Sequence, residues 1–243
     1  MIYSLKKIIL YCSVLFLNFI PIIHAENISD KLIKVKKIMD NITFTGNAGF
    51  RIKYNNIVIS IDPFELKGSS IKSDIILITH PHFDHLDIES LNEIRSSSSK
   101  IVATIDSSKM ISGSVHIIEP GTKVSIKGIE IMAVPAYNIN KNNHPKINGW
   151  VGYIIKLGDI IVYHTGDTDF IPEMNDIYAD LVLLPVGGVA TMDAKEAFEA
   201  FKAIRPVLAI PMHYGAVFGT IENAKEFEKL AGKKSVIILD KKN

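Results

Sequence analysis

A short run of metal-binding side chains directly after a fully apolar segment constrains this chain more than any other feature. Residues Ile75–Ile78 are all apolar, and after Thr79 the sequence reads His-Pro-His-Phe-Asp-His at residues 80–85. An apolar run without alternation predicts a strand that is covered on both faces. Imidazole and carboxylate groups are ligands for Zn²⁺ and similar cations, and alternate residues of an extended chain point the same way. The sequence therefore predicts a metal-binding loop at the end of a buried strand.

The first 25 residues have the pattern of a secretory signal peptide. Lys6-Lys7 precede the mostly apolar stretch Ile8–Ile23, and Ala25 provides a small residue for cleavage. We therefore expect residues 1–25 to be a signal peptide and residues 26–243 to form a single mature domain, exported to the periplasm or secreted. The apolar stretch falls short of the roughly 20 residues of a spanning helix. We expect no stable membrane anchor, with a retained anchor as the alternative.

The composition of the mature part excludes some function classes. Removing Lys6 and Lys7 from 27 basic residues leaves 25, against 26 acidic residues, so the formal charge is −1. A near-neutral chain lacks the basic footprint that nucleic acids require, and we expect no nucleic-acid partner. The basic cluster at residues 31–37 predicts a solvated helix, with contact to an anionic membrane as the alternative. The only cysteine, Cys12, falls in the predicted signal peptide, so neither a disulfide nor a thiolate ligand is expected.

Strand and helix patterns alternate along the rest of the chain. Apolar and β-branched runs predict strands at residues 42–45, 49–54, 57–61, 73–79, 101–104, 115–118, 124–126, 129–134, 151–156, 160–164, 181–184, 207–210 and 236–239. Helical patterns cover residues 28–39, 87–96, 193–204 and 222–231. Series of hairpins that finish as strand–helix–strand units need helices on their outer faces. The fold class predicted is α/β, a four-layer αββα sandwich of two mixed sheets.

Three further residues could complete a metal site. His144 stands in a polar loop, Asp167 follows a predicted strand in Gly166-Asp167-Thr168, and His213 follows another strand. Each one borders a strand end. Taken alone, a loop histidine is more often a surface residue, and a loop aspartate more often a turn former.

Considered together, these motifs resemble the metallo-β-lactamase superfamily across the whole mature chain. More narrowly, the chain resembles the ascorbate-6-phosphate-lactonase-like branch of metal-dependent hydrolases. The segments that carry this narrower resemblance are Ile61-Asp62-Pro63-Phe64, Ala133-Val134-Pro135-Ala136-Tyr137-Asn138, Tyr163-His164-Thr165-Gly166-Asp167-Thr168, Leu184-Pro185-Val186-Gly187-Gly188 and Ile210-Pro211-Met212-His213-Tyr214-Gly215. The resemblance implies the αββα fold and a dinuclear metal centre.

Transferred to this chain, the resemblance implies a ligand set for two divalent cations. One ion would be held by His80, His82 and His144, the other by Asp84, His85 and His213, with Asp167 bridging them. Zn²⁺ is the first choice, and Mn²⁺ or Fe²⁺ would suit the same ligands. The chain departs from the branch at Asn47, where relatives commonly carry a histidine, and the role of this position is left open.

Two bridged cations predict a metal-dependent hydrolase in which a metal-bound hydroxide attacks a small ester, lactone or phosphodiester substrate. Asp84 is expected to orient the nucleophile as well as to bind metal, so we assign it a catalytic role. Tyr137, Asn138 and Tyr214 flank proposed ligands and are predicted to bind substrate, with ordinary packing as the alternative for each. His164 is interpreted as a packed histidine, against a proton-shuttle role. A phosphodiesterase or nuclease on this fold and a non-catalytic exported metal-binding protein are the alternative functions.

Overall fold

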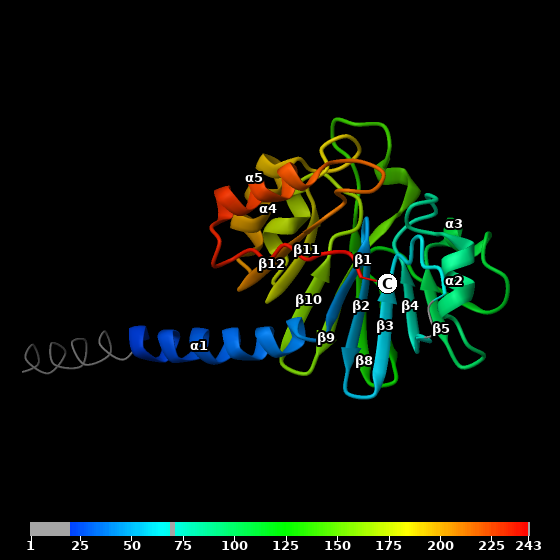
Figure 1. The fold of residues 1–243 in the computed structure, drawn as a ribbon, viewed down its shortest axis with the longest axis horizontal. Coiled ribbons are helices and arrows are strands. Elements are labelled where there is room, and N and C mark those ends of the chain that lie inside the picture. The colour runs from blue at the N-terminus through cyan, green and yellow to red at the C-terminus, as the bar shows by residue number, and fades with distance from the viewer. Residues whose placement is uncertain (1–19, 69–70, 243) are drawn as a thin grey trace, which may run out of the picture.

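The structure is a computed structural model that describes residues 20–68 and 71–242. Two six-stranded sheets lie face to face, with helices on their outer sides (Figure 1). The αββα sandwich predicted from the sequence is confirmed. Most of the predicted signal peptide, residues 1–19, lies outside the described residues.

The first half of the chain builds one sheet in sequence order, β1 to β6. Its strands are β1 (Ile42–Gly46), β2 (Gly49–Tyr54), β3 (Ile57–Ile61), β4 (Ile75–Ile78), β5 (Lys100–Ala103) and β6 (Val115–Ile117). The first three strands pair antiparallel, and the pairs from β3 to β6 are parallel. All four residues of β4 are buried, as its apolar sequence predicts.

The second half of the chain repeats this plan, again in sequence order. Its strands are β7 (Lys123–Ile126), β8 (Ile129–Pro135), β9 (Val151–Leu157), β10 (Ile160–His164), β11 (Leu181–Pro185) and β12 (Leu208–Met212). Strands β7 to β10 pair antiparallel, and β10, β11 and β12 are parallel. Because parallel strands end at the same edge, the loops after β3, β4, β10 and β12 gather at one edge of the sandwich.

The helices cover the outer faces. Helix α2 (Ile88–Ile94) begins at its cap Asp87, and the short α3 (Ile105–Ser108) follows β5. Helix α4 (Ala194–Ile204) opens with the predicted capping box of Asp193 and Glu196, and α5 (Ile221–Ala231) follows β12. Two short 3₁₀ helices, η1 (Lys146–Asn148) and η2 (Pro172–Asp176), were not predicted.

Helix α1 (Ile20–Met39) runs through the predicted cleavage point after Ala25 and packs its C-terminal part on the sandwich. Val35 is fully buried. Lys31 lies 3.2 Å from a carboxylate oxygen of Asp180, and Lys34 lies 2.8 Å from Asp159. Two charges of the basic cluster are therefore paired within the protein. Among the described residues, no helix has both the length and the apolar content needed to cross a membrane.

One predicted strand is wrong. Residues 236–239 form no strand; they meet the sheet through a single parallel bridge between Ala209 and Val236. The Ile237 amide donates to the Ala209 carbonyl, and the segment then leaves β12 and reaches β1, where the Lys242 amide donates to Phe44 O. The apolar residues of this segment pack on the core without extending the sheet.

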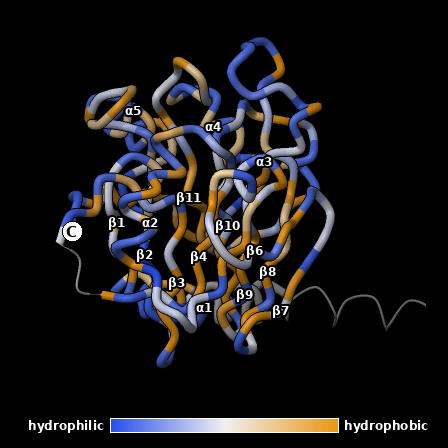
Figure 2. The backbone as a smooth tube through the Cα atoms, turned by 90° about the vertical axis from the view of Figure 1, so that its right-hand side faces the viewer, coloured by the Kyte–Doolittle hydropathy of each residue, from blue (hydrophilic) through white to orange (hydrophobic). Residues whose placement is uncertain are grey.

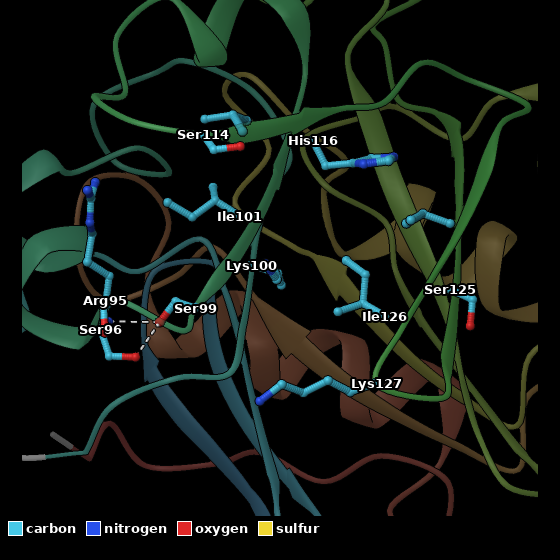
Figure 3. Close-up of a pocket in the computed structure, with 13 residues that line it drawn as sticks. Arg95, Ser96, Ser99, Lys100, Ile101, Ser114, His116, Ser125, Ile126 and Lys127 are labelled. Atoms are coloured by element: carbon cyan, nitrogen blue, oxygen red, sulfur yellow. Dashed lines mark hydrogen bonds between the residues drawn. The ribbon is translucent and has the colours of Figure 1, made fainter.

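Hydrophobic residues concentrate along central strands such as β4 and β11, while hydrophilic residues dominate the outer loops (Figure 2). Beside β6 and β7, which are edge strands of the two sheets, lies a cavity of about 670 Å³ whose lining includes Arg95, Lys100, His116 and Lys127 (Figure 3). None of the predicted metal ligands lines this cavity.

Candidate metal centre

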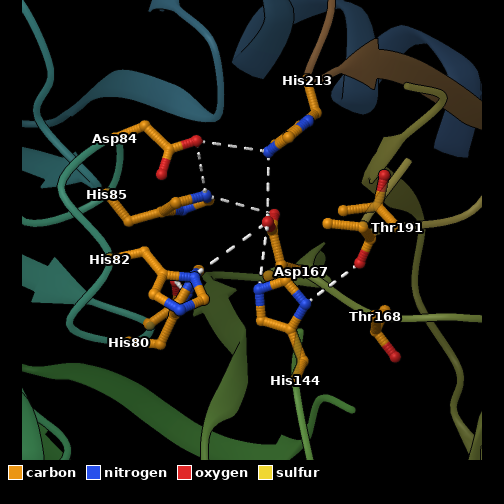
Figure 4. Close-up of polar contacts among 12 residues, drawn as sticks. His80, His82, Asp84, His85, His144, Asp167, Thr168, Thr191 and His213 are labelled. Carbon is orange, nitrogen blue, oxygen red and sulfur yellow. Dashed lines mark hydrogen bonds and ion pairs between the residues drawn. The ribbon is translucent and has the colours of Figure 1, made fainter. Parts of the chain in front are cut away.

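The seven predicted metal ligands come together in one place, in the loops at one edge of the sandwich (Figure 4). Four of them stand in the loop after β4, one follows β10, one follows β12, and His144 stands in the loop between β8 and β9. Gly166 allows the turn that presents Asp167, because its φ is +65° and a Cβ there would lie 2.6 Å from Val151 O. His213 has a φ of +60°, a conformation that non-glycine residues adopt mainly where surrounding structure enforces it.

The first group of ligand atoms contains three imidazoles. His80 Nε2 lies 3.1 Å from His82 Nδ1, and His144 shares a common centre with both rings. A tetrahedral cation with bonds of about 2.1 Å separates its ligand atoms by about 3.4 Å. The spacing of this group therefore fits one cation. His82 is half-buried, so the group borders solvent on that side.

The second group contains a carboxylate and two imidazoles. Asp84 Oδ2 lies 3.7 Å from His85 Nε2 and 3.5 Å from His213 Nε2. All three residues are buried. A carboxylate with two imidazole nitrogens at these distances is again a suitable ligand set for a borderline divalent cation.

Asp167 lies between the two groups. Its Oδ2 is 3.4 Å from His144 Nε2 and 4.0 Å from His80 Nε2, on the side of the first group. The same carboxylate is 3.2 Å from His85 Nε2 through Oδ1 and 3.1 Å from His213 Nε2 through Oδ2, on the side of the second. One carboxylate therefore contacts ligands of both groups.

Several ligand atoms at the centre lack hydrogen-bond partners, which a bound cation would replace. The Nε2 atoms of His85, His144 and His213 and the Oδ1 atom of Asp167 are buried without a hydrogen-bond partner. Buried polar atoms normally have such partners, so a converging set without them needs another source of stabilisation. Cations coordinated by these lone pairs would provide it.

The imidazoles of the first group favour the neutral form. Burial holds the pKa of His80 well below its usual range and lowers the pKa of His144 to about 4. Burial also lowers the pKa of His82, and the nearby His85 acts in the same direction. Neutral imidazoles are the form that binds metal.

In the second group, nearby carboxylates raise the pKa values of the imidazoles. Burial opposes charge on His213, but Asp167 and Asp84 outweigh it and raise its pKa to about 9. Against the same effect of burial, Asp167 and Asp62 raise the pKa of His85 well above its usual range. Burial disfavours the charged form of Asp84, yet contact with His213 leaves its pKa lowered. A cation entering this group therefore replaces protons.

A buried aspartate outside the predicted site fixes the tautomers of two ligands. His85 Nδ1 donates to Asp62 Oδ2 at 2.7 Å, so His85 Nε2 faces the centre. The Thr79 hydroxyl donates to Asp62 Oδ2 at 2.6 Å and therefore accepts from His80 Nδ1 at 2.9 Å, which leaves His80 Nε2 free as well. Asp62 directly follows β3, beside β4. The parallel pairing of these strands is the signal that could have placed it near the ligands.

The loop that carries His144 is held by a second network. His144 Nδ1 lies 3.0 Å from Ala190 O and 3.1 Å from Asn138 Oδ1, both of them acceptors, so Nε2 faces the centre. Asn138 Nδ2 in turn donates to Asp169 Oδ1 and to Ala190 O. Asp169 also accepts from Lys141 Nζ. Asn138, predicted to bind substrate, thus has its amide group engaged in holding His144.

Asn47 contacts the second group. Its Nδ2 donates to Asp84 Oδ2 at 3.0 Å and to Asp84 O at 3.2 Å, and its carbonyl accepts from the His213 amide at 2.6 Å. Its Oδ1 is buried without a partner. Asn47 therefore links two ligands of one group.

The other two predicted substrate-binding residues use their hydroxyls elsewhere. Tyr137 donates to Glu173 Oε2 at 2.9 Å, and Tyr214 donates to Leu239 O at 3.0 Å. Both side chains are buried. Their hydroxyls therefore take part in local packing, and their predicted contact with substrate stays a prediction.

His164 is fully buried below the centre. Its Nε2 donates to Ala48 O at 2.9 Å, and its Nδ1 accepts from the Gly166 amide at 3.2 Å. Both ring nitrogens are thus bonded to backbone, and His164 supports the turn before Asp167. Trp150, the only tryptophan of the chain, lies closer to the first group, with its ring centroid 4.8 Å from that of His82.

The chain is similar to known proteins over most of its length. The profile of the beta-lactamase superfamily domain matches residues 41–213. A UPF0173 metal-dependent hydrolase from Thermococcus kodakarensis is 33% identical over 217 residues, covering 83% of this chain and 96% of the relative. A protein of the same description from Pyrococcus furiosus is 34% identical over 222 residues, with the same coverage of both chains.

Solved structures of metal-dependent hydrolases also match this chain. A metal-dependent hydrolase from Parabacteroides distasonis matches with a TM-score of 0.74 and 33% identity, covering 82% of this chain and 93% of that chain. A metallo hydrolase from Ignicoccus hospitalis matches with a TM-score of 0.67 and 25% identity, covering 83% and 95%. The chain therefore belongs to the metallo-β-lactamase superfamily, as its motifs predicted, and within it to the UPF0173 metal-dependent hydrolases.

Proposed function

We propose that the mature protein uses two divalent cations to hydrolyse a small ester, lactone or phosphodiester. The observation that carries this proposal is the position of Asp167, whose carboxylate contacts ligand atoms of both groups. When bound, two such ions supply Lewis acidity and a hydroxide nucleophile at neutral pH, by lowering the pKa of a bound water to about 7. No nucleophilic side chain is then required.

The protein's own residues hold and orient this centre. Asp84 would hold one ion and orient the attacking oxygen, since its Oδ2 faces both His85 and His213. Asn47 keeps that carboxylate in place by donating to it. Asp62 fixes the tautomer of His85, and through Thr79 that of His80. Such hydrogen bonds preserve ligand orientation, and their loss typically weakens metal binding or activity by about 10- to 100-fold.

Zn²⁺ is the cation we propose, because buried imidazoles and carboxylates at this spacing suit it. Mn²⁺ and Fe²⁺ accept the same ligands. Metal analysis of the purified protein by plasma emission spectroscopy distinguishes them.

The test of the activity is a screen of lactones, esters and phosphodiesters, with and without a chelator. Chelator-sensitive hydrolysis that returns with added metal supports the proposal. Absence of any metal-dependent turnover would leave the non-catalytic metal-binding protein in its place. Hydrolysis of bis(p-nitrophenyl) phosphate together with salt-dependent nucleic-acid binding would favour the nuclease alternative, which the charge of −1 on the mature part disfavours. Nitrocefin tests for a β-lactamase.

We also propose that the protein acts outside the cytoplasm after loss of residues 1–25. The proposal rests on the charged and apolar pattern of that segment and on the small residue Ala25. Intact-mass measurement of exported protein should find a chain that starts at Glu26. A mass that begins at Met1 would contradict this and favour a retained anchor.

A further inference from the structure

Exposed apolar side chains stand on the loops that carry the candidate metal ligands. Ile147, three residues after His144, is 92% exposed, and Phe83, between His82 and Asp84, is 66% exposed. Val189 is 59% exposed. These are the three largest exposed fractions among the exposed large apolar side chains of the described residues. Single exposed apolar residues are normal on a protein surface, but a concentration of them indicates a binding site.

Each of these residues is close in sequence to a candidate metal ligand or to a residue that contacts one. Val189 precedes Ala190, whose carbonyl lies 3.0 Å from His144 Nδ1. Two further exposed residues extend the set. Phe218 stacks on the His213 ring at 6.0 Å between centroids, and Ile139 follows Asn138, which lies against His144. We call the five residues the apolar rim; they are Phe83, Ile139, Ile147, Val189 and Phe218.

A buried aromatic side chain adjoins the first group. The ring centroid of Trp150 lies 4.8 Å from that of His82 and 5.5 Å from that of His144. A molecule whose reactive group reaches the ligands of the first group would therefore have its remaining part among apolar side chains.

The charges beside the rim are already paired. Lys141 bonds to Asp169 and Glu196, and Lys146 bonds to Glu173. The two lysines of the loop around His144 are thus matched by three carboxylates from other segments of the chain. This balance disfavours an anionic substrate or an anionic membrane surface, because neither would find an unpaired cation among these groups.

We propose that the apolar rim binds an alkyl or aryl group of the substrate, so that the substrate class is uncharged esters or lactones with a substantial apolar part. The proposal rests on the proposed hydrolase function and specifies the substrate of the same site. Short, highly polar substrates would leave the rim in water. A longer apolar group would remove that surface from water.

The first test is the hydrolysis of p-nitrophenyl esters with acyl chains of graded length. Complete burial of a methylene group strengthens binding about fourfold, so partial burial against the rim should raise kcat/KM at least about 10-fold from acetate to hexanoate. Ile147→Ala combined with Val189→Ala should reduce this ratio. The matched control is Ile33→Ala on α1, a residue that is 51% exposed and distant in the fold, and it should leave the ratio unchanged.

The second test does not depend on catalysis. Isothermal titration should find that the uncharged amides octanamide and hexanamide bind the wild-type protein more tightly than acetamide does, and that the double variant loses this preference. A flat dependence on chain length in both experiments, with hydrolysis intact, overturns the rim proposal and leaves the hydrolase proposal standing. Absence of hydrolysis for every ester, lactone and phosphodiester of the screen is a failure of the hydrolase proposal, and the titration then tests the rim alone. A flat dependence with a dimer that the double variant dissociates would make a second copy the occupant and overturn the proposal.

Discussion

The two halves of the candidate metal centre differ in how they are built. The first group consists of imidazoles from His80, His82 and His144, whose pKa values burial lowers. The second group pairs Asp84 with His85 and His213, whose pKa values nearby carboxylates raise. One half offers neutral lone pairs at neutral pH, while the other holds protons between its imidazoles and carboxylates.

This difference has a thermodynamic consequence for metal binding. A cation that enters the first group meets ligands that are already deprotonated, whereas a cation that enters the second must displace protons. We therefore expect the second position to bind more weakly than the first as the pH falls. Asp167 contacts both halves, so its removal should weaken metal binding in both of them.

The largest effect is expected for Asp167→Ala. Loss of the shared carboxylate should weaken both positions and reduce kcat/KM by about 10³-fold or more, as loss of an essential catalytic group does. Metal content measured by plasma emission should fall toward zero. His82→Ala and His144→Ala are the controls, because each should empty chiefly one position. Loss of a single ion in Asp167→Ala would contradict a bridging role.

The second-largest effect on activity is expected for Asp84→Asn. The change keeps size and shape but removes a negative charge from the second group, so one ion should bind more weakly and the attacking oxygen should lose its orientation. We expect kcat/KM to fall about 10²-fold, or about 2.7 kcal/mol of transition-state stabilisation. Steady-state kinetics at saturating metal measures this. Near-wild-type activity that still responds to chelator would remove Asp84 from the mechanism.

A pair of asparagines tests the two halves separately. Asn47 donates to Asp84 in the second group, and Asn138 lies against His144 in the first. Asn47→Ala should weaken only the second ion, and Asn138→Ala only the first, each by about 10-fold in affinity. Trp150 lies beside the first group, so the change in its fluorescence on metal binding reports occupancy of the first position. Equal effects of both variants on both ions would contradict the division of the centre into two separately supported groups.

The pH dependence of stability should have opposite signs in the two halves. His144 has its pKa lowered to about 4, so the chelated protein should lose stability as the pH falls below about 6.5, where the unfolded chain takes up the proton. His213 has its pKa raised to about 9, and its contribution is fully present below about 6.5 and lost as the pH rises through about 9.

Thermal unfolding of the chelated protein should therefore have its highest Tm near neutral pH, with decreases of a few degrees on either side, as about 1 kcal/mol produces in a chain of this size. His144→Gln should flatten the acid side, and His213→Gln the alkaline side. A profile that neither variant changes would show that these pKa shifts do not govern stability.

The smallest effect on activity is expected for His164→Gln. Both ring nitrogens of His164 are bonded to backbone, at Ala48 O and at the Gly166 amide. Glutamine should cost some stability in the turn before Asp167 but leave kcat/KM close to wild type when metal is saturating. Loss of activity here with retention in Asp84→Asn would move His164 into the catalytic machinery.

The sequence was most informative where function depends on local pattern. The apolar run of β4 and the histidines after it predicted both the strand and the loop. Residues whose role depends on distant neighbours were not recognised. Asp62 acts on His85, 23 positions away, and Asp169 accepts from Asn138, 31 positions away. The segment at 236–239 was misread because its apolar pattern serves packing as well as a strand would.

The most direct test is a metal titration of the mature protein. Calorimetry in two buffers of different ionisation enthalpy gives both the stoichiometry and the protons released. If Asp167 joins two sites, two ions should bind per chain, the first with little proton release and the second with a clear release near neutral pH. A stoichiometry near one, or equal proton release for both ions, would contradict a bridged centre with two unlike halves.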